Sequence, residues 1–251
     1  MSVQGSFAAV ARDGGRAALV TVVAGPHLGA RLLVRADGRQ EGALGDAQLR
    51  ENAVAHAQDL MWTERSEMRG ELFVDVTAPP PRLLIFGAIA YASDLARLAR
   101  VAGWRPFVID PRARFATRAR FPDAVEVVVA WPGAALQRLG AIDRATYVAV
   151  LSNDPKIDDA VLLLALSAEP AYVGAMGSRH AQAKRSARLR AAGASEDDLN
   201  RISAPVGLDL GALTAAETAL SVMAEVVAVR HGREGGRLSA RRDGRDPSTS
   251  L

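Results

Sequence analysis

The sequence predicts an α/β protein, with a Rossmann-like parallel sheet covered by helices on both faces and preceded by a small α+β N-terminal domain. Two observations support this fold class. After residue 82, short apolar segments alternate with segments of helical periodicity, which is typical of parallel βαβ units. Before residue 78, apolar or alternating segments flank a single helical segment, which indicates a separate, smaller domain.

Residues 1–77 are expected to form the small α+β domain. Turn residues such as Gly25-Pro26 separate its apolar segments. The expected order is strand Ala17–Val23, strand Ala30–Val34, helix Leu49–Trp62 and strand Glu71–Val76. Residues 78–82 contain three consecutive prolines, which cannot join a helix or a sheet ladder, and are expected to be a linker.

Residues 83–231 are expected to form the Rossmann-like domain. The predicted strands are Leu83–Phe86, Phe107–Ile109, Val125–Ala130, Thr146–Leu151 and Ala171–Met176. The predicted helices are a segment ending at Val101, Pro155–Ala168, Ser178–Ala192 and Thr214–His231. The last helix begins with a capping-box spacing, Thr214 to Glu217. Residues 232–251 are rich in Gly, Arg and Ser without periodicity, so they are predicted to be a disordered tail.

Composition excludes several kinds of site. The absence of cysteine excludes disulfides, thiolate–metal sites and a cysteine nucleophile. The four histidines lack ligand spacing, so we expect no metal held by protein side chains. No basic segment followed by a long apolar one begins the chain, and no segment approaches the ~20 apolar residues that span a bilayer. We therefore expect a cytoplasmic protein without membrane contact.

The sequence isoelectric point of about 9.8 does not predict nucleic-acid binding. The net charge is only +3, and only Lys156 and Lys184 among the 31 basic residues are lysines. Because arginine hardly titrates, a small arginine excess raises the isoelectric point strongly. Acidic and basic residues are interspersed up to the tail, and no basic groove with aromatic residues is apparent.

Candidate ligand-binding residues follow the predicted strands of the Rossmann-like domain. Ligands of open parallel sheets bind outside the carboxyl ends of the strands, so residues at these positions are expected to share one edge. Glycine, carboxylate and arginine side chains gather there. The cofactor-binding candidates are Gly87, Ala88, Asp110, Arg112, Asn153, Asp154, Gly177, Ser178, Arg179 and, on a later loop, Asp209.

The turn after the first strand resembles a dinucleotide fingerprint that lacks its middle glycine. Gly87 and Ala92 suit the tight turn and close helix packing, but the middle position is Ile89, whose side chain would occupy the space of a pyrophosphate. Asp110 could bind a ribose, or could form a strand-end turn with Pro111. An NAD(P)-dependent oxidoreductase is therefore a disfavoured alternative.

Gly177-Ser178-Arg179 is the better candidate for an anion site. Gly177 lets the chain turn, Ser178 can cap the helix, and free amides at a helix start favour a phosphate. Arg179 could add a bidentate contact. The alternative for Ser178 is plain capping. The later basic residues of this helix are expected to form a solvated face: Lys184, Arg185, Arg188 and Arg190.

Asn153 and Asp154 follow the fourth strand and precede a helix. Capping and dipole compensation are sufficient explanations for Asp158 and Asp159 in the first turn of that helix. Asp154 is the better functional candidate, because it lies nearer to the strand end. The glycines of the Pro205–Gly211 loop are expected to be structural, whereas Asp209 could face the cleft.

The order of these motifs resembles the XdhC/CoxI family, the accessory proteins of molybdenum hydroxylases such as xanthine dehydrogenase and aerobic carbon monoxide dehydrogenase. The resemblance covers Leu83 to Ala228, and the smaller domain adds Ala18–Val23 and Gly42–Asp46. The segments that carry it are Asp110-Pro111-Arg112, Phe115-Ala116-Thr117, Arg120-Phe121-Pro122, Asp154–Asp159, Tyr172–Arg179, Pro205–Gly211 and Ala224-Glu225.

The resemblance implies a maturation factor rather than a catalyst. Such a protein would transiently bind the molybdenum cofactor (molybdopterin), protect it during sulfuration and hand it to an apo-hydroxylase. A sulfurase would be a further partner. An interaction-only maturation factor without a bound ligand is the alternative. The apolar helix Thr214–His231 could form a homodimer, but burial of this helix against its own sheet is favoured.

Three positions depart from the family pattern. Many members carry Gly-Gly-Cys in the small domain, where this chain has Gly45-Asp46, so a thiolate contact to the metal is excluded. Members often carry Thr-His-Asp at the position of Ser152-Asn153-Asp154, and a second glycine at Ile89. The departures fit either a divergent subfamily with another cofactor form or a member that mainly binds protein.

Overall fold

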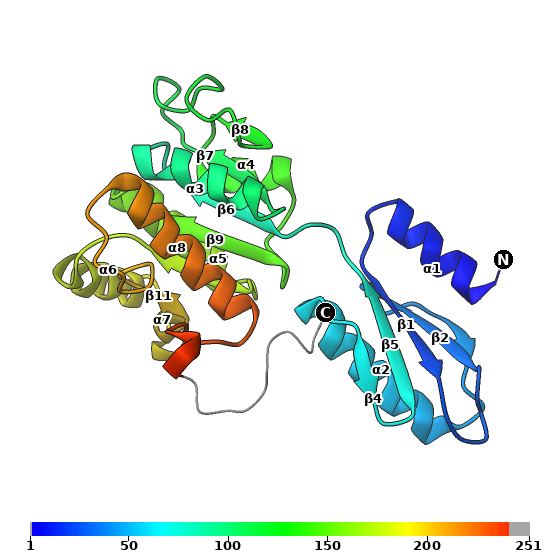
Figure 1. Ribbon diagram of the computed structural model, residues 1–251. Coiled ribbons are helices and arrows are strands. Elements are labelled where there is room, and N and C mark those ends of the chain that lie inside the picture. Colours follow the sequence, from blue (N-terminus) through cyan, green and yellow to red (C-terminus); the bar gives the residue numbers. More distant parts are fainter. Residues whose placement is uncertain (1, 241–251) are drawn as a thin grey trace. The chain divides into compact units, whose positions relative to one another are not determined.

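The computed structural model describes residues 2–240 (Figure 1). The chain divides into two compact units, Met1–Pro81 and Arg82–Leu251, and each unit is described by itself. Residues 241–251 of the predicted tail lie outside the described residues. Residues 232–240 run through a turn into a short 3-10 helix, Leu238–Ala240. No helix in residues 2–240 is long and apolar enough to cross a membrane.

The first unit is a five-stranded antiparallel sheet with two helices. The sheet order is β3-β2-β1-β5-β4. The strands are β1 (Ala17–Val22), β2 (Arg31–Arg35), β3 (Gln40–Ala43), β4 (Glu67–Arg69) and β5 (Leu72–Thr77). The helices are α1 (Val3–Arg12) and α2 (Ala47–Thr63). The core lies between α2 and the sheet, where Ala53, Ala57 and Leu60 pack against Val20 and Val74.

The second unit contains a six-stranded sheet of parallel strands. Its order is β11-β10-β9-β6-β7-β8, and every neighbouring pair is parallel. The strands are β6 (Arg82–Phe86), β7 (Arg105–Ile109), β8 (Glu126–Val128), β9 (Thr146–Val150), β10 (Tyr172–Ala175) and β11 (Ile202–Ser203). The helices are α3 (Ala90–Val101), α4 (Pro132–Leu139), α5 (Pro155–Leu166), α6 (Arg179–Ala191), α7 (Glu196–Asn200) and α8 (Ala215–Arg230).

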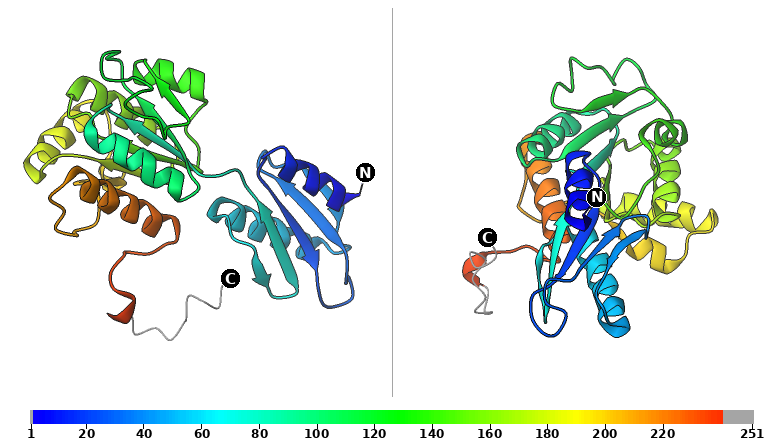
Figure 2. Two further views of the ribbon diagram at one scale, coloured as in Figure 1. Left: turned by 45° about the horizontal axis from the view of Figure 1, so that its top comes forward. Right: turned by 90° about the vertical axis from the view of Figure 1, so that its right-hand side faces the viewer.

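Helices cover both faces of this sheet (Figure 2). On one face, α3 and α8 pack on each other and on side chains such as Leu83 and Ile85. On the other face, α4, α5 and α6 cover side chains such as Leu84 and Phe86. Successive residues of β6 thus enter opposite cores, which explains its wholly apolar interior and confirms the predicted parallel sheet with helices on both faces.

The apolar side of α8 is buried within its own unit. Val222 and Val226 are at most 2% exposed and belong to the core that α8 shares with α3. The prediction that this helix packs against its own sheet is therefore confirmed.

Several short elements were not predicted from the sequence. They are α1, α4, α7, β3, β4 and β11. The edge strand β3 is polar and largely exposed, so it carries no apolar pattern. The strand β11 has only two residues, and α7 has five, which is below the length at which periodicity can be recognised. Helix α1 starts at the capping residue Ser2.

The chain direction across the sheet places a crevice between two strands. From β6 the chain proceeds outward to β7 and β8, and then returns to β9 on the other side of β6 before continuing to β10 and β11. The strand order therefore reverses between β6 and β9. Loops leave the carboxyl ends of these two strands in opposite directions, and open α/β sheets bind ligands at this point.

Candidate functional site

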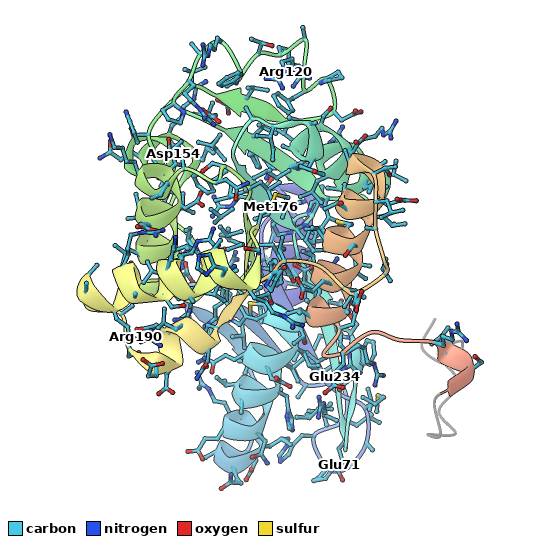
Figure 3. All side chains as sticks on the ribbon, turned by 90° about the vertical axis from the view of Figure 1, so that its left-hand side faces the viewer. Glu71, Arg120, Asp154, Met176, Arg190 and Glu234 are labelled. Atoms are coloured by element: carbon cyan, nitrogen blue, oxygen red, sulfur yellow. The ribbon has the colours of Figure 1, made fainter. Side chains whose placement is uncertain are left out.

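The candidate site lies at the carboxyl edge of the parallel sheet, around the reversal between β6 and β9. Four loops meet this edge, and they follow β6, β7, β9 and β10. Figure 3 shows Asp154 where α5 begins and Met176 where β10 ends. The structure thus brings the predicted strand-end residues to one side of the second unit.

Gly87 permits the close approach of the first loop to the third. Its φ is +114°, and a Cβ at this position would lie 2.6 Å from the backbone nitrogen of Ser152. Such a contact is too short for a real side chain, and residues other than glycine rarely adopt this φ. Gly87 therefore serves the packing of the two loops at the strand reversal, as expected for a tight turn.

Asp110 joins the loop after β7 to the loop after β6. Its buried carboxylate accepts hydrogen bonds from the backbone nitrogen of Ala88 at 2.9 Å and from the backbone and side chain of Arg112 at 2.7–2.9 Å. Burial opposes ionisation, but these hydrogen bonds outweigh it and lower the pKa of Asp110. Three predicted site residues, Ala88, Asp110 and Arg112, therefore form one contact group.

The positive charge of Arg112 also interacts with the acidic residues that follow β9. Its hydrogen bonds to Asp110 raise the pKa of the guanidinium, and the negative charges of Asp154 and Asp158 add to that rise. The side chain is 35% exposed, so one part faces solvent at the edge of the sheet. Arg112 therefore places a partly exposed positive charge at this edge, and the carboxylates of Asp154 and Asp158 favour that charge.

The geometry of the first turn differs from that of a dinucleotide site. The amide of Ala88 already donates to Asp110, and both carboxylate oxygens of Asp110 accept hydrogen bonds from Arg112. Ile89 packs partly buried against the core beneath α3 and provides no side-chain cap for that helix. A ribose hydroxyl and a pyrophosphate would have to displace these contacts.

Asn153 and Asp154 form the turn into α5. Asp154 caps the helix, because its carboxylate accepts a hydrogen bond from the backbone nitrogen of Lys156 at 3.0 Å. Asn153 is exposed and has a φ of +56°, a left-handed conformation that non-glycine residues adopt infrequently. Its Oδ1 lies 3.8 Å from the point that a Cβ on Gly177 would occupy. The third and fourth loops therefore meet at Asn153 and Gly177.

The fourth loop ends in the predicted anion site. Ser178 caps α6 by accepting a hydrogen bond from the backbone nitrogen of Ala181 at 3.2 Å. Within the part of the chain that the structure describes, the amides of Ser178, Arg179 and His180 donate to no protein acceptor. The side chain of Arg179 is exposed. Capping by Ser178 and free amides thus occur together.

A buried ion pair lies directly beneath these loops, where the sequence predicted a solvated helix face. The Nη2 of Arg185 lies 3.0 Å from Oδ2 of Asp158, and both side chains are at most 5% exposed. The same Nη2 donates to the carbonyl of Met176 at 2.8 Å. Asp158 also accepts a short hydrogen bond from the hydroxyl of Ser152. Burial raises the pKa of Asp158 despite these donors.

The prediction that Arg185 is solvated was therefore wrong, and the explanation of Asp158 by dipole compensation alone was insufficient. Arg185 lies one helical turn before Leu189, which is 1% exposed, so both occupy the buried side of α6. This spacing is the sequence signal that could have identified Arg185. Of the other three basic residues predicted for this face, Lys184 and Arg190 are exposed, while Arg188 is half-exposed and pairs with Asp159.

The remaining predicted residue, Asp209, is exposed on the loop that follows β11. This loop is held by Glu225, which accepts hydrogen bonds from the backbone nitrogen of Gly207 at 2.9 Å and, at a shorter distance, from the hydroxyl of Tyr172. Burial, followed by the charge of Glu225, raises the pKa of Tyr172, so the phenol remains a donor. The pairing of Tyr172 with Glu225 was not predicted from the sequence.

The described residues contain no group of three or more His, Asp or Glu side chains arranged to hold a metal ion. In the first unit, Gly45-Asp46 begins a helix: Asp46 caps α2 by accepting from the backbone nitrogen of Leu49 at 2.7 Å. The carboxylates of Asp110 and Asp154 at the sheet edge of the second unit are engaged in turn and capping hydrogen bonds. The remaining polar groups are free amides, the guanidinium of Arg179 and the amide side chain of Asn153. This set suits an oxyanion such as a phosphate.

Two family models match the chain. The model of the XdhC Rossmann domain matches residues 83–226, and the model of the XdhC and CoxI family matches residues 10–70.

Three curated relatives are similar to the chain. A probable subunit of xanthine dehydrogenase from Bacillus subtilis is 30% identical over 159 residues, which cover 63% of this chain and 46% of the relative. The molybdenum cofactor insertion chaperone PaoD of Escherichia coli is 32% identical over 156 residues, 62% of this chain and 42% of the relative. The uncharacterized protein YqeB of Escherichia coli is 27% identical, over 84% of this chain and 42% of the relative.

The chain thus spans less than half the length of these curated relatives. The crystal structure of a xanthine dehydrogenase from Bacillus halodurans superposes with a TM-score of 0.60 at 22% identity, covering 93% of this chain and 64% of that chain. This structural similarity supports the fold.

Proposed function

The chain belongs to the XdhC and CoxI family, and from this premise we propose that it is an accessory chaperone that binds the molybdenum cofactor. In this role it assists sulfuration of the cofactor and its insertion into the apo-form of a molybdenum hydroxylase. The name of one relative, a molybdenum cofactor insertion chaperone, supports the proposal. The client hydroxylase and a sulfurase are the proposed partners, and the cytoplasm is the proposed location.

The observation that carries the proposal is the convergence of anion-binding groups at the reversal of the sheet. The free amides at the start of α6 and the exposed side chain of Arg179 follow the turn at Gly177, and Gly177 lies beside Asn153 of the neighbouring loop. Because molybdopterin carries a phosphate, these groups suit its phosphate end. The cofactor-binding residues proposed on this basis are Gly87, Ala88, Asp110, Arg112, Asn153, Asp154, Gly177, Ser178, Arg179 and Asp209.

The donor set fits the organic part of the cofactor better than its metal. Without cysteine, the chain has no thiolate, and the described residues form no His/Asp/Glu cluster. Arg179 and the α6 amides would bind the phosphate, while Asn153 would orient the ligand at the β9 end. Arg112 and Asp110 would hold the far side of the crevice in place.

The test is cofactor retention by the purified protein. The protein is incubated anaerobically with molybdenum cofactor and passed through gel filtration, and bound cofactor is measured as fluorescence of the oxidised pterin. We expect stoichiometric pterin on the wild-type protein and a reduction of about tenfold for Arg179→Ala, because one charge-assisted contact is lost. Lys184→Ala is the matched control, since it removes an exposed charge from the same helix.

Two outcomes would contradict the proposal. Absence of pterin on the wild-type protein would refute cofactor binding and favour a maturation factor that only contacts protein. Equal loss in Arg179→Ala and Lys184→Ala would mean that the start of α6 is not the binding site. Heat on titration with a nicotinamide dinucleotide would instead favour the oxidoreductase alternative.

A further inference from the structure

The loop between β7 and β8 carries a concentration of positive charge. Residues 111–124, here called the arginine loop, contain four arginines and a single acidic residue, Asp123. The arginines are Arg112, Arg114, Arg118 and Arg120. One of them, Arg112, is neutralised by the buried carboxylate of Asp110. The positive charges of the other three arginines are not neutralised by Asp110.

Three guanidinium groups of the loop surround one aromatic ring. The guanidinium carbons of Arg112, Arg114 and Arg120 lie 4.9, 4.5 and 5.9 Å from the ring centroid of Phe115. An aromatic face attracts each cation, so the ring gathers side chains that would otherwise repel one another. Phe115 therefore holds several like charges close together at the surface.

Within the described residues 2–240, the loop arginines beyond Arg112 have no ion-pair partner. Arg114, Arg118 and Arg120 are exposed, and no carboxylate lies within 4 Å of their nitrogens. Arg118 donates to the carbonyl of Ala124, and Arg120 donates to the carbonyl of Phe115 at 2.8 Å. These bonds position the side chains but leave their positive charges uncompensated.

The loop is also rigidly anchored. Ala116 and Phe121 are 5% and 1% exposed and belong to the core beneath α3. Backbone hydrogen bonds, such as those from Phe115 and Ala116 to the carbonyl of Arg112, form successive turns between these anchors. The arginines are thus presented by an ordered backbone, which lowers the entropy cost of binding a partner.

We propose that the arginine loop is a docking surface for an acidic patch on a partner protein. Carboxylates match guanidinium groups in charge and in bidentate geometry. The loop projects from the second unit (Figure 1), and Figure 3 shows Arg120 at its outer side, well apart from Met176. Small-molecule sites are concave, whereas these exposed side chains on a projecting loop suit a protein surface.

The position of the loop gives docking a consequence for the candidate site. Arg112 is the first arginine of the loop and shares the ring of Phe115, and its guanidinium donates to Asp110, which also accepts from the backbone nitrogen of Ala88 in the loop after β6. A partner bound to Arg114 and Arg120 would therefore lie beside the crevice between β6 and β9. That this partner is the hydroxylase receiving the cofactor rests on the proposed function, whereas the preference for an acidic protein does not.

The test measures binding of an acidic polypeptide to the full chain. Fluorescein-labelled poly-L-glutamate is titrated with wild-type protein, with Arg114→Ala/Arg120→Ala and with Arg97→Ala/Arg100→Ala, and fluorescence anisotropy gives the Kd. The second double variant is the matched control, because it removes two exposed arginines from α3. We expect the loop variant to weaken binding at least about tenfold and the control to change it less than about threefold. Added salt should weaken wild-type binding.

A conservative variant distinguishes the effect of losing positive charge from the effect of disturbing the fold. Arg114→Lys/Arg120→Lys keeps both charges but loses the planar fork, so its affinity should lie between those of the wild type and the alanine variant. Equal weakening by the loop and control variants would overturn the proposal. The proposal would also fail if the loop variant lost affinity for inorganic pyrophosphate, or for a single-stranded oligonucleotide, but not for poly-L-glutamate.

The same variants distinguish this proposal from the proposed function. If both are correct, Arg114→Ala/Arg120→Ala retains pterin after gel filtration but loses poly-L-glutamate binding. Wild-type protein that binds poly-L-glutamate through the loop but retains no pterin would refute the proposed function alone. Protein that retains pterin while both double variants bind poly-L-glutamate like the wild type would refute the docking surface alone.

Discussion

Asp158 and Arg185 form an ion pair of 3.0 Å between α5 and α6, and both side chains are at most 5% exposed. The pair connects the loops that follow β9 and β10, because Ser152 donates to Asp158 and Arg185 donates to the carbonyl of Met176. The start of α6, which carries the free amides of the candidate site, is therefore fixed to the sheet by a buried charge pair.

Removing the cation of this pair should destabilise the second unit strongly. Arg185→Ala leaves the Asp158 carboxylate buried without its counter-charge, which costs about 3–5 kcal/mol. Lys184→Ala removes a neighbouring exposed cation and should change the free energy of unfolding by less than about 0.5 kcal/mol. Urea unfolding measures the change in the free energy of unfolding of the second unit for each variant. A cost for Arg185→Ala similar to that for Lys184→Ala would show that the pair does not support the edge.

Gly87 should tolerate no side chain. Gly87→Ala places a Cβ 2.6 Å from the backbone nitrogen of Ser152 at a φ of +114°, so we expect a loss of about 2–4 kcal/mol. The matched control is Gly103→Ala, where φ is +79° but no atom lies within 4 Å of the new Cβ. Backbone strain alone should cost the control about 1 kcal/mol. Equal losses would mean that the close approach to Ser152 does not matter.

The sequence allowed prediction of those elements whose apolar pattern reflects burial on the sheet. Strand β6 has a wholly apolar interior because Leu84 and Ile85 enter opposite cores. Helix α8 was located by the capping box of Thr214 and Glu217, which the structure contains. The polar edge strand β3 and the two-residue strand β11 had no such pattern, since neither buries an apolar face.

For the candidate site, the positions of the residues along the chain predicted which loops lie close together. They did not predict which side chains form hydrogen bonds or ion pairs. The rule that ligands bind at the carboxyl edge correctly predicted that the strand-end loops meet, and Asn153 lies beside Gly177. It could not show that the Asp110 carboxylate is occupied by Ala88 and Arg112. Nor could composition separate the buried Arg185 from its exposed neighbours, because only its spacing of one helical turn from the apolar Leu189 indicates the buried side of α6.

The stability that Asp110 contributes should depend on pH. Its folded-state pKa is lowered from 3.8, so its ionisation stabilises the fold above that value, and this contribution is lost as the pH falls through the lowered pKa. Asp110→Asn should therefore lower the free energy of unfolding by about 1.5–3 kcal/mol at pH 7. The difference from the wild type should shrink as the pH falls below about 4.

A partly exposed carboxylate on α3 provides the control for Asp110. Asp94 pairs with Arg97 on the helix surface, so Asp94→Asn should change the free energy of unfolding by less than about 1 kcal/mol across the same pH range. Urea unfolding at pH values of about 7, 5, 4 and 3 gives both differences. A difference between wild type and Asp110→Asn that stays constant over this range would contradict the assigned ionisation.

The loop after β11 should depend on Glu225, which accepts from both the hydroxyl of Tyr172 and the backbone nitrogen of Gly207. Glu225→Ala leaves both donors without their acceptor, so we expect a loss of about 2–4 kcal/mol in the free energy of unfolding. Tyr172→Phe removes one donor and keeps the bond to Gly207, and should cost about 1–1.5 kcal/mol. Glu169→Ala, which breaks an exposed pair with Arg144, is the control and should cost less than about 1 kcal/mol. If Glu225→Ala were no more costly than Tyr172→Phe, the contact with Gly207 would contribute nothing, and the loop that carries Asp209 would be held by other interactions.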